Sequence, residues 1–265
     1  MAALAGASLT LSRSSVLALA GENGAGKSTL IKILSGAIRA DAGEVLIDGS
    51  APRLHNPSEA TNQGVATVYQ ELSLLPQQSV AENLFLGHYP RRRGFIDWAR
   101  AHREADALLG RLGVAIPVHA PVASLGLAEQ YLVEIAKAVR NGPKILILDE
   151  PTAALDPSDS ERIFSLMDEL RHSGTSMIFV SHRLEELFRC AQQYMVLKDG
   201  VTVAQGDMAQ TFEDELVAKM LGFPSGEART AVSPQKTPTR PFRRPKGQGV
   251  PSVSADEDII LRVRG

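Results

Sequence analysis

The stretch that decides the fold is residues 21–29, which reads Gly-Glu-Asn-Gly-Ala-Gly-Lys-Ser-Thr. It satisfies the phosphate-loop pattern G-x-x-x-x-G-K-[ST], in which successive backbone amides surround a di- or triphosphate before a helix begins. The apolar run at 16–20 is typical of a buried strand, and apolar residues within 30–34 give the following helix an apolar face. The stretch therefore predicts a strand, loop and helix unit that binds ATP or GTP.

Each part of this loop has a chemical reason. A side chain at Gly24 or Gly26 would block the approach of the backbone to phosphate or would need an unfavourable φ. Lys27 supplies a positive charge to the β- and γ-phosphates, and Ser28 can place its hydroxyl on Mg²⁺. The helix, expected from about residue 29 to residue 37, points the positive end of its dipole at the phosphates. The residues that we expect to bind the nucleotide are Gly21, Glu22, Asn23, Gly24, Ala25, Gly26, Lys27, Ser28 and Thr29.

The composition limits the possible functions. The 265 residues can hold one large domain with extensions, and 44% hydrophobic with 22% charged residues is typical of a globular protein. A formal net charge of −2 gives no electrostatic reason to expect nucleic acid as a partner, and we expect the basic run at 91–93 to be a solvated loop. The single cysteine, Cys190, cannot form an internal disulfide. No apolar stretch is long enough to span a bilayer, so any membrane role would be peripheral, through other subunits.

Residues 3 to about 222 alternate short apolar runs with helical patterns, which predicts an α/β domain. Strands are expected at 45–47 and 65–69, and the pattern becomes helical from 80 to 113. The fully apolar runs at 145–148 and 177–180 are typical of buried parallel strands, whose carboxyl ends face a ligand in α/β folds. A sheet with its binding site at one edge is therefore expected.

Four polar side chains follow the ends of these expected strands. They are Asp149 and Glu150 after one apolar run, His182 after another, and Gln70 at the end of a third. We expect Asp149, with Ser28, to hold Mg²⁺, and Glu150 to polarise an attacking water. Gln70 could reach both the metal and the water, and an imidazole at His182 could hydrogen-bond the γ-phosphate.

The composition shifts after residue 222. Residues 223–257 are polar, basic and rich in proline, which predicts a linker. Residues 258–265 regain strand character, and we expect them to be the first strand of a truncated second nucleotide-binding domain. The first domain would then span 1–222, with a helical subdomain at about 80–140.

As a set, these motifs resemble the ATPase subunits of ATP-binding cassette (ABC) transporters. The resemblance covers roughly residues 3–222 and adds the D-loop, Ala154-Leu155-Asp156, to the phosphate loop, the Q-loop glutamine, the Walker B pair and the switch histidine. It implies an α/β P-loop NTPase of the ABC ATPase type, with a mixed sheet and a helical subdomain. The segments at 68–74, 81–87, 96–98, 133–138 and 181–186 look like monosaccharide importers of the ribose, xylose and galactose type, which carry two such modules in one chain.

The resemblance implies an enzyme that binds ATP and Mg²⁺ and hydrolyses ATP to energise sugar import, as a peripheral subunit at the cytoplasmic face of the membrane. The implied partners are a second nucleotide-binding module, fused or separate, integral membrane permease subunits and, indirectly, a sugar-binding protein. Three alternatives stay open: the ATPase of another importer class, a soluble ABC ATPase, and a non-catalytic module that binds ATP to regulate assembly. The sequence does not identify the sugar, because selectivity belongs to the binding protein and the membrane subunits.

The family signature, Leu-Ser-Gly-Gly-Gln, is altered in this chain. The matching positions are Leu125, Gly126, Leu127, Ala128 and Glu129. In the family this signature acts on ATP bound to the opposite module. Losing a hydroxyl that bonds an anionic phosphate removes roughly 1.5–3 kcal/mol, a factor on the order of 10 to 100 in rate. We therefore expect an asymmetric dimer, in which the site completed by Gly126 and Ala128 is slow.

The beginning of the chain departs from the family as well. An amino-terminal strand and an aromatic residue that stacks on adenine would precede Leu4 in the family, and neither is visible here. We expect the sheet to lack an edge strand that helps to cover the core. We also expect the isolated chain to bind nucleotide weakly, mainly through the phosphates, and to hydrolyse it poorly.

Overall fold

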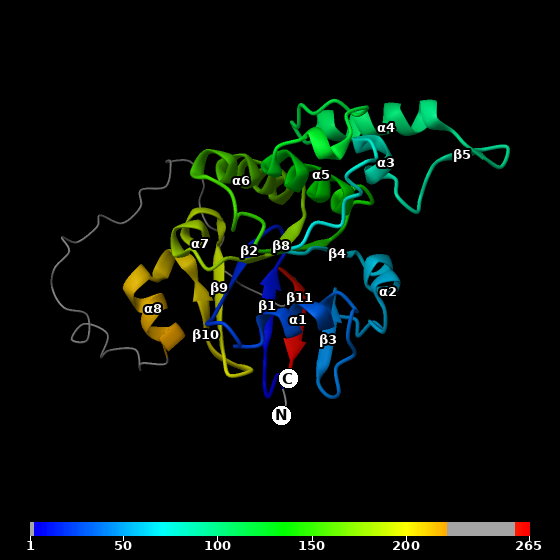
Figure 1. Ribbon diagram of the computed structural model, residues 1–265. Helices are drawn as coiled ribbons and strands as arrows, with labels where there is room; N and C mark the ends of the chain where they lie inside the picture. The colour runs from blue at the N-terminus through cyan, green and yellow to red at the C-terminus, as the bar shows by residue number, and fades with distance from the viewer. Residues whose placement is uncertain (1–2, 222–257) are drawn as a thin grey trace.

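The computed structural model describes residues 3–221 and 258–265, so the predicted linker at 223–257 lies outside the described residues. Its main feature is a six-stranded mixed sheet of order β10-β9-β2-β8-β7-β4, with helices packed on it (Figure 1). The strands are β2 (Val16–Ala20), β4 (Val65–Val68), β7 (Ile145–Asp149), β8 (Ser176–Val180), β9 (Gln193–Lys198) and β10 (Val201–Asp207). All neighbouring pairs are parallel except β9–β10. The expected α/β fold with a mixed sheet is confirmed.

The alternation of side chains along the central strands divides the buried residues into two cores. In β2, Ala18 belongs to one core, whereas Leu17 and Leu19 belong to the other. The first core is completed by α5 (Leu127–Val139) and α6 (Pro157–His172), and the second by α1 (Lys27–Leu34) together with a smaller sheet. Because both faces of the strands are covered, their sequences are apolar throughout rather than alternating.

The smaller sheet has three antiparallel strands in the order β1-β11-β3. They span Leu9–Ser12 in β1, Glu44–Ile47 in β3 and Ile259–Arg264 in β11. In β11, Leu261 pairs with Leu11 on one side and with Ile47 on the other, so a strand from the carboxyl end of the sequence lies between two strands from its beginning (Figure 1, β11 in red). Leu261 is 1% exposed.

That the sheet lacks an edge strand at its amino-terminal end stays a prediction. β11 is the central strand of the smaller sheet, hydrogen-bonded to neighbours on both sides. Its sequence suits the place, because Leu261 and Val263 are two residues apart and therefore point to the same face, into the second core. That residues 258–265 open a second domain stays a prediction.

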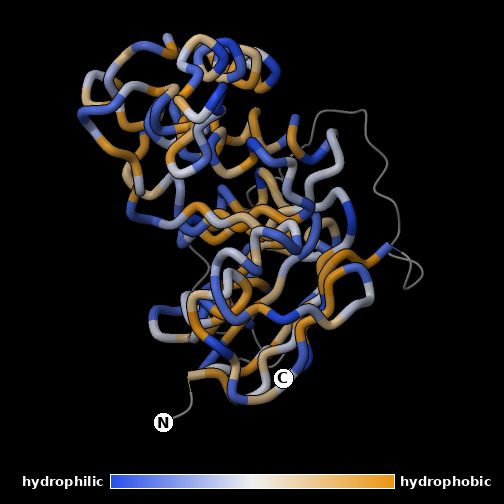
Figure 2. The backbone as a smooth tube through the Cα atoms, turned by 90° about the vertical axis from the view of Figure 1, so that its right-hand side faces the viewer, coloured by the Kyte–Doolittle hydropathy of each residue, from blue (hydrophilic) through white to orange (hydrophobic). Residues whose placement is uncertain are grey.

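The remaining helical elements mostly connect the strands. They are α2 (Pro57–Asn62), α3 (Val80–Leu84), α4 (Trp98–Arg111), η1 (Val122–Ser124), α7 (Leu184–Cys190), η2 (Met208–Gln210) and α8 (Glu213–Leu221). Figure 2 shows from the side that the part containing α3, α4 and α5 forms a layer above the sheets.

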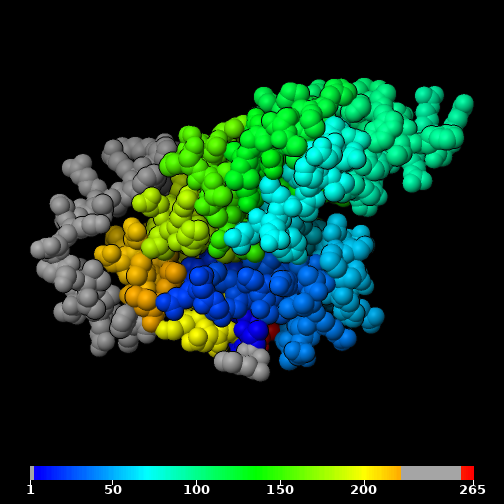
Figure 3. Space-filling view, in the orientation of Figure 1, coloured from blue at the N-terminus to red at the C-terminus, as the bar shows by residue number. Residues whose placement is uncertain are grey.

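The expectation of a helical pattern from 80 to 113 is wrong in its middle. Between α3 and α4 the chain forms a hairpin of β5 (Arg91–Arg92) and β6 (Phe95–Ile96). Two glycines in the left-handed region, Gly87 with φ 77° and Gly94 with φ 89°, interrupt the helical pattern there. The hairpin residues are exposed, and Figure 3 shows this region projecting from the body of the molecule at the upper right.

We predict that Leu261→Ala lowers the free energy of unfolding by about 2–4 kcal/mol, because it leaves a cavity in the second core. Arg264→Ala is the matched control in the same strand, since Arg264 is exposed. Urea unfolding followed by circular dichroism measures both. Equal stability of the two variants would show that β11 is not docked between β1 and β3 in solution.

Candidate active site

The phosphate loop joins β2 to α1. The helix begins at Lys27, earlier than residue 29, and its N-cap is Gly26 with φ 103°; a Cβ there would lie 2.7 Å from Leu4 Cδ2. At Gly24, with φ 85°, a Cβ would meet no atom within 4 Å, so its backbone conformation, and not crowding within the chain, requires glycine. The helix ends at Leu34 rather than at residue 37, because Gly36 follows in the left-handed region with φ 71°.

Lys27 lies against its own loop. Its Nζ donates hydrogen bonds to the backbone carbonyls of Gly21, at 2.8 Å, and Glu22, at 3.0 Å. Burial lowers the pKa of Lys27, while Glu150 and Asp149 act in the opposite direction. No acidic residue occupies the first turn of α1, so nothing in that turn neutralises the positive end of the helix dipole. An ammonium group and a helix terminus therefore offer positive charge to the same loop, as a phosphate site requires.

Asp149 and Glu150 occupy the carboxyl end of β7, beside the end of β8. Asp149 pairs with Val180, and the amide of Glu150 donates to the carbonyl of Val180 at 3.0 Å. Glu150 then takes a φ of 51°, in the left-handed region that non-glycine residues rarely adopt. This turn ends the alternation of the strand, so Glu150 does not have to point away from Asp149. Such strain is frequent where a functional side chain has to be aimed.

The charges around these residues are interdependent. Burial raises the pKa of the Asp149 carboxyl, the charge of Glu150 raises it further, and Lys27 and Lys32 oppose the shift. Lys27 in turn feels both carboxylates, which opposes the effect of its own burial. The structure thus brings Lys27, Asp149 and Glu150 together, although they come from two separate parts of the sequence.

His182 completes this group from the end of β8. Its Nδ1 lies 3.5 Å from Glu150 Oε2, a contact that is an ion pair only when the imidazole is protonated. The His182 side chain is 59% exposed and that of Glu150 is 21% exposed. An accessible imidazole beside a mostly covered carboxylate can reach a ligand that approaches the sheet edge from solvent.

Gln70 lies just beyond β4, and its side chain is exposed. The backbone carbonyl oxygen of Gln70 accepts a hydrogen bond from Tyr131 Oη at 2.9 Å. Burial raises the pKa of Tyr131, and the charge of Glu150 raises it further, so Tyr131 lies between the Gln70 loop and the Glu150 turn. The sequence analysis did not single out Tyr131; the available signal was its hydroxyl group among the apolar residues of α5.

The altered signature occupies the start of α5. Gly126 is the N-cap, and its amide donates to Glu129 Oε2 at 3.1 Å, which is half of a capping box because glycine has no side chain to complete it. Within residues 3–221 and 258–265, no hydrogen bond joins positions 125–129 to the phosphate loop. That the signature acts on a nucleotide held by another module stays a prediction.

Asp156, the residue of the expected D-loop, is the N-cap of α6. Its carboxylate accepts hydrogen bonds from the amide of Asp159 at 2.9 Å and from Ser158 Oγ at 2.8 Å. The bond from Asp159 is the main reason why the pKa of Asp156 lies below its usual range. Asp156 therefore fixes the end of the loop that leads from Glu150 into α6.

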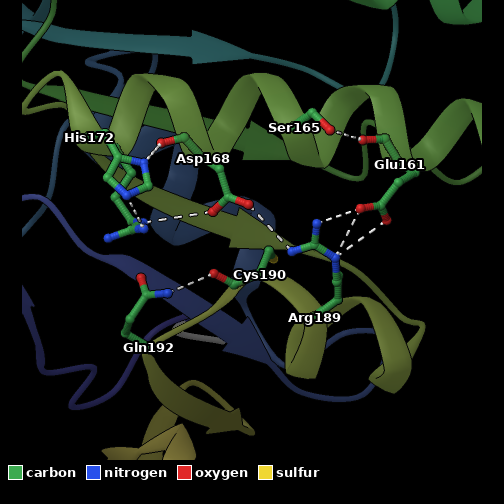
Figure 4. Close-up of polar contacts among 8 residues, drawn as sticks. Glu161, Ser165, Asp168, His172, Arg189, Cys190 and Gln192 are labelled. Atoms are coloured by element: carbon green, nitrogen blue, oxygen red, sulfur yellow. Dashed lines mark hydrogen bonds and ion pairs between the residues drawn. The ribbon is translucent and has the colours of Figure 1, made fainter. Parts of the chain in front are cut away.

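Ionic contacts hold α7, the helix after His182, against α6 (Figure 4). Arg189 on α7 pairs with Glu161 and, at 3.4 Å, with Asp168, both on α6. The neighbouring Cys190 is buried, which raises the pKa of its thiol, and its carbonyl accepts a hydrogen bond from Gln192 Nε2 at 3.1 Å. These contacts anchor the segment on the carboxyl side of His182 to the rest of the fold.

The expected metal ligands suit Mg²⁺. Among the residues that the structure describes, no group of three or more His, Cys, Asp and Glu side chains could hold a metal ion by itself. Mg²⁺ is usually held by one or two carboxylates together with phosphates and water, which matches Asp149 and the hydroxyl of Ser28. Burial first, and the charge of Glu150 second, raise the pKa of Asp149, and a cation beside its carboxylate would favour the charged form.

Comparisons with known proteins agree with the resemblance inferred from the motifs. Residues 4–153 match the family model described as ABC transporter. The chain is 49% identical over 219 residues to the ribose import ATP-binding protein RbsA of Chromobacterium violaceum, covering 82% of this chain and 44% of that protein. The chain thus spans less than half the length of the curated relatives that it matches.

Solved structures show the same fold. An ATP-binding cassette of an ABC transporter has a TM-score of 0.74 and 26% identity, covering 83% of this chain and 91% of the other. A dimeric, post-hydrolysis ATP-binding cassette bound to ADP and Pi has a TM-score of 0.66 and 25% identity, covering 79% and 92%. The fold that the motifs predict is therefore confirmed by solved structures of ATP-binding cassettes.

We predict that Asp149→Asn stabilises the folded chain at neutral pH by up to about 1 kcal/mol, a small gain because the site is partly open to water. The folded-state pKa of Asp149 is raised, so its contribution to stability is present at low pH and is lost as the pH rises through that pKa. The gain should therefore disappear in acid.

Thermal unfolding across a pH series measures this difference. Asp106→Asn is the control, since Asp106 is exposed on α4, and it should change little at any pH. An Asp149→Asn chain that melts below the unmodified protein at neutral pH would contradict the electrostatic description of the site.

Proposed function

The chain belongs to the ABC transporter family, and on that premise we propose that it binds ATP and hydrolyses it to energise the import of a sugar across the cytoplasmic membrane. The observation that carries the proposal is the meeting of Lys27, Asp149, Glu150 and His182 at one edge of the parallel sheet. Positive charge for phosphates, a carboxylate for a metal and a second carboxylate for water are the components of phosphoryl transfer to water.

The nucleotide would be held mainly by the loop. The amides of residues 21–28 and the ammonium of Lys27 bind the phosphates, for which Lys27 has to exchange its carbonyl partners for phosphate oxygens. Ser28, Asp149 and the amide of Gln70 would hold Mg²⁺, which supplies charge neutralisation at the β- and γ-phosphates. Positioning and charge are the main needs of this reaction, because its transition state spreads charge over the phosphoryl oxygens.

Glu150 is the residue that we assign to the attacking water. It would accept a proton from water as the γ-phosphoryl group is transferred, and its side chain, 21% exposed just after β7, keeps some access to solvent. His182, whose Nδ1 is 3.5 Å from Glu150 Oε2, can donate a hydrogen bond to the γ-phosphate. Gln70 reaches the metal and the water from the end of β4. These roles make the site respond to the presence of the terminal phosphate.

We propose further that the working form contains a second nucleotide-binding module, fused or separate. A solved relative of the same fold is dimeric and is bound to ADP and Pi, which supports this arrangement. In such a pair the signature at 125–129 would act on the partner's nucleotide; among residues 3–221 and 258–265 it makes no hydrogen bond to the phosphate loop of its own chain. The alterations at Gly126 and Ala128 would then slow that composite site, which makes the pair asymmetric.

The proposals of a sugar substrate and of membrane partners are based on the relatives of this chain. Several relatives that match this chain at 43–49% identity are ribose import ATP-binding proteins, which favours a monosaccharide over other imported solutes. No helix among residues 3–221 and 258–265 is long and apolar enough to cross a membrane. We therefore propose attachment to integral permease subunits at the cytoplasmic face, with a sugar-binding protein acting through them. Another importer class, a soluble ABC ATPase and a non-catalytic regulatory module are the alternatives.

Glu150→Gln tests the catalytic assignment. We expect ATP hydrolysis, measured as phosphate release from the chain assembled with its membrane partners, to fall at least about 100-fold, because the general base is lost while the shape is kept. Binding of ATP should persist. Glu213→Gln changes an exposed carboxylate on α8 and serves as the control. Hydrolysis that is unaffected by Glu150→Gln would favour the regulatory module, and co-purification without membrane proteins would favour the soluble ATPase.

Restoring the signature tests the proposed asymmetry. Gly126→Ser should be tolerated, because φ is −64° and a Cβ would find only Glu129 Oε2, at 3.9 Å. Together with Ala128→Gly it should raise turnover in the assembled transporter by roughly 10 to 100-fold if this site limits the rate. Ala138→Gly weakens the same helix elsewhere and is the control for the added glycine. Turnover that does not change would remove the case for a slow site.

A further inference from the structure

Glu186, on α7, is a buried carboxylate that the roles assigned above do not use. Its side chain is 7% exposed. Oε2 accepts two hydrogen bonds, from Thr152 Oγ1 at 2.6 Å and from Ser181 Oγ at 2.5 Å. Both hydroxyl groups belong to buried residues on other segments of the chain, so this one oxygen links the loop after β7 with the loop after β8.

Arg183 extends the same network to the D-loop. Its Nη1 donates to Glu186 Oε1 at 3.2 Å and to the carbonyl of Leu155 at 3.4 Å, and its Nη2 donates to the carbonyl of Ala153 at 3.3 Å. The amide of Arg183 also donates to Ser181 Oγ at 3.0 Å. The path from the catalytic turn to the N-cap of α6 is thus fixed to the loop that carries His182.

The positions of these contacts matter more than their number. Thr152 is two residues after Glu150, and Ser181 directly precedes His182. The separation of Glu150 from His182, 3.5 Å between Oε2 and Nδ1, depends on how these two loops are placed relative to each other. Glu186 Oε2 is the atom that both loops share, and an accurate separation is what an oriented catalytic pair needs.

A contribution to stability does not by itself explain why a carboxylate is buried at position 186. Moving a carboxylate out of water costs free energy, and its hydrogen bonds in the protein recover about that amount. Well-packed apolar residues of similar volume often give equal or greater stability. A hydrogen-bonded carboxylate adds geometric specificity, because each donor has to meet a particular oxygen atom. Such specificity is what fixes the relative position of two catalytic loops.

We propose that Glu186 is a positioning residue for ATP hydrolysis. Through its hydrogen bonds to Thr152, Ser181 and Arg183, it fixes the Glu150 turn, the His182 loop and the D-loop relative to one another. The inference rests on the proposed function for its catalytic part, whereas its structural part applies to the chain alone. Glu186 does not touch the nucleotide and acts only through the residues that it binds.

Two pairs of variants separate positioning from simple support of the fold. Thr152→Val removes the hydroxyl while keeping the shape, and Thr152→Ser keeps the hydroxyl. Glu186→Gln alters the buried carboxylate, and Glu185→Gln makes the same change at the adjacent exposed glutamate. Steady-state kinetics on the assembled transporter should show kcat for ATP lowered about tenfold in Thr152→Val and Glu186→Gln, with KM changed less than about twofold. Thr152→Ser should retain most of the activity, and Glu185→Gln all of it.

A second measurement uses the chain alone and needs no hydrolysis. Amide hydrogen exchange should become faster within 150–156 and 181–183 in Thr152→Val and Glu186→Gln, while exchange in β7 and β8 stays as in the unmodified chain. An unmodified transporter that does not hydrolyse ATP would end the proposed function, and the exchange data would still decide the positioning role. The inference is overturned if exchange in the two loops is unchanged, or if Thr152→Val is as active as Thr152→Ser.

Discussion

The carboxyl edge of the parallel sheet is the constraint on which the rest of the structure depends. β2, β7 and β8 are neighbours and run in the same direction, so the residues after them share a small volume. An ammonium group and two carboxylates meet there at the cost of partial burial, which raises the pKa of Asp149 and lowers that of Lys27. Charges in this state are poorly solvated, and a ligand that combines phosphate with a cation complements both of them.

The apolar structure on both faces of the sheet keeps this edge in place. One core lies under α5 and α6, and the other lies between the sheet, α1 and the strands β1, β11 and β3. The phosphate loop is attached to the second core through Leu30, Ile31 and Leu34 of α1. β11 contributes to that core from the opposite end of the sequence, so the support of the nucleotide site includes a strand that the sequence places more than 200 residues away.

Polar groups around the site connect its loops and do not only cap local structure. Asp156 begins α6, Tyr131 ties the Gln70 loop to the neighbourhood of Glu150, and Glu186 joins the loops after β7 and β8. The contacts of Tyr131 and Glu186 pass between segments that follow different strands. The relative positions of these strand-end loops are therefore held by direct hydrogen bonds.

The sequence by itself determined the phosphate loop, the buried parallel strands and the polar residues at their ends, because these are local patterns: glycines at fixed spacing, apolar runs and the residue after each run. The interpretation of 80–113 as helical was wrong in its middle, where Gly87 and Gly94 allow a hairpin. Only the tertiary structure decided that Glu150 turns through a positive φ toward Asp149 and His182, and that β11 lies between β1 and β3. The same is true of the hydrogen bond from Tyr131 to the backbone at Gln70 and of the link that Glu186 makes between the loops after β7 and β8. These features depend on contacts between distant segments, and the free energy of such contacts is set by packing and burial, which no short stretch of sequence contains.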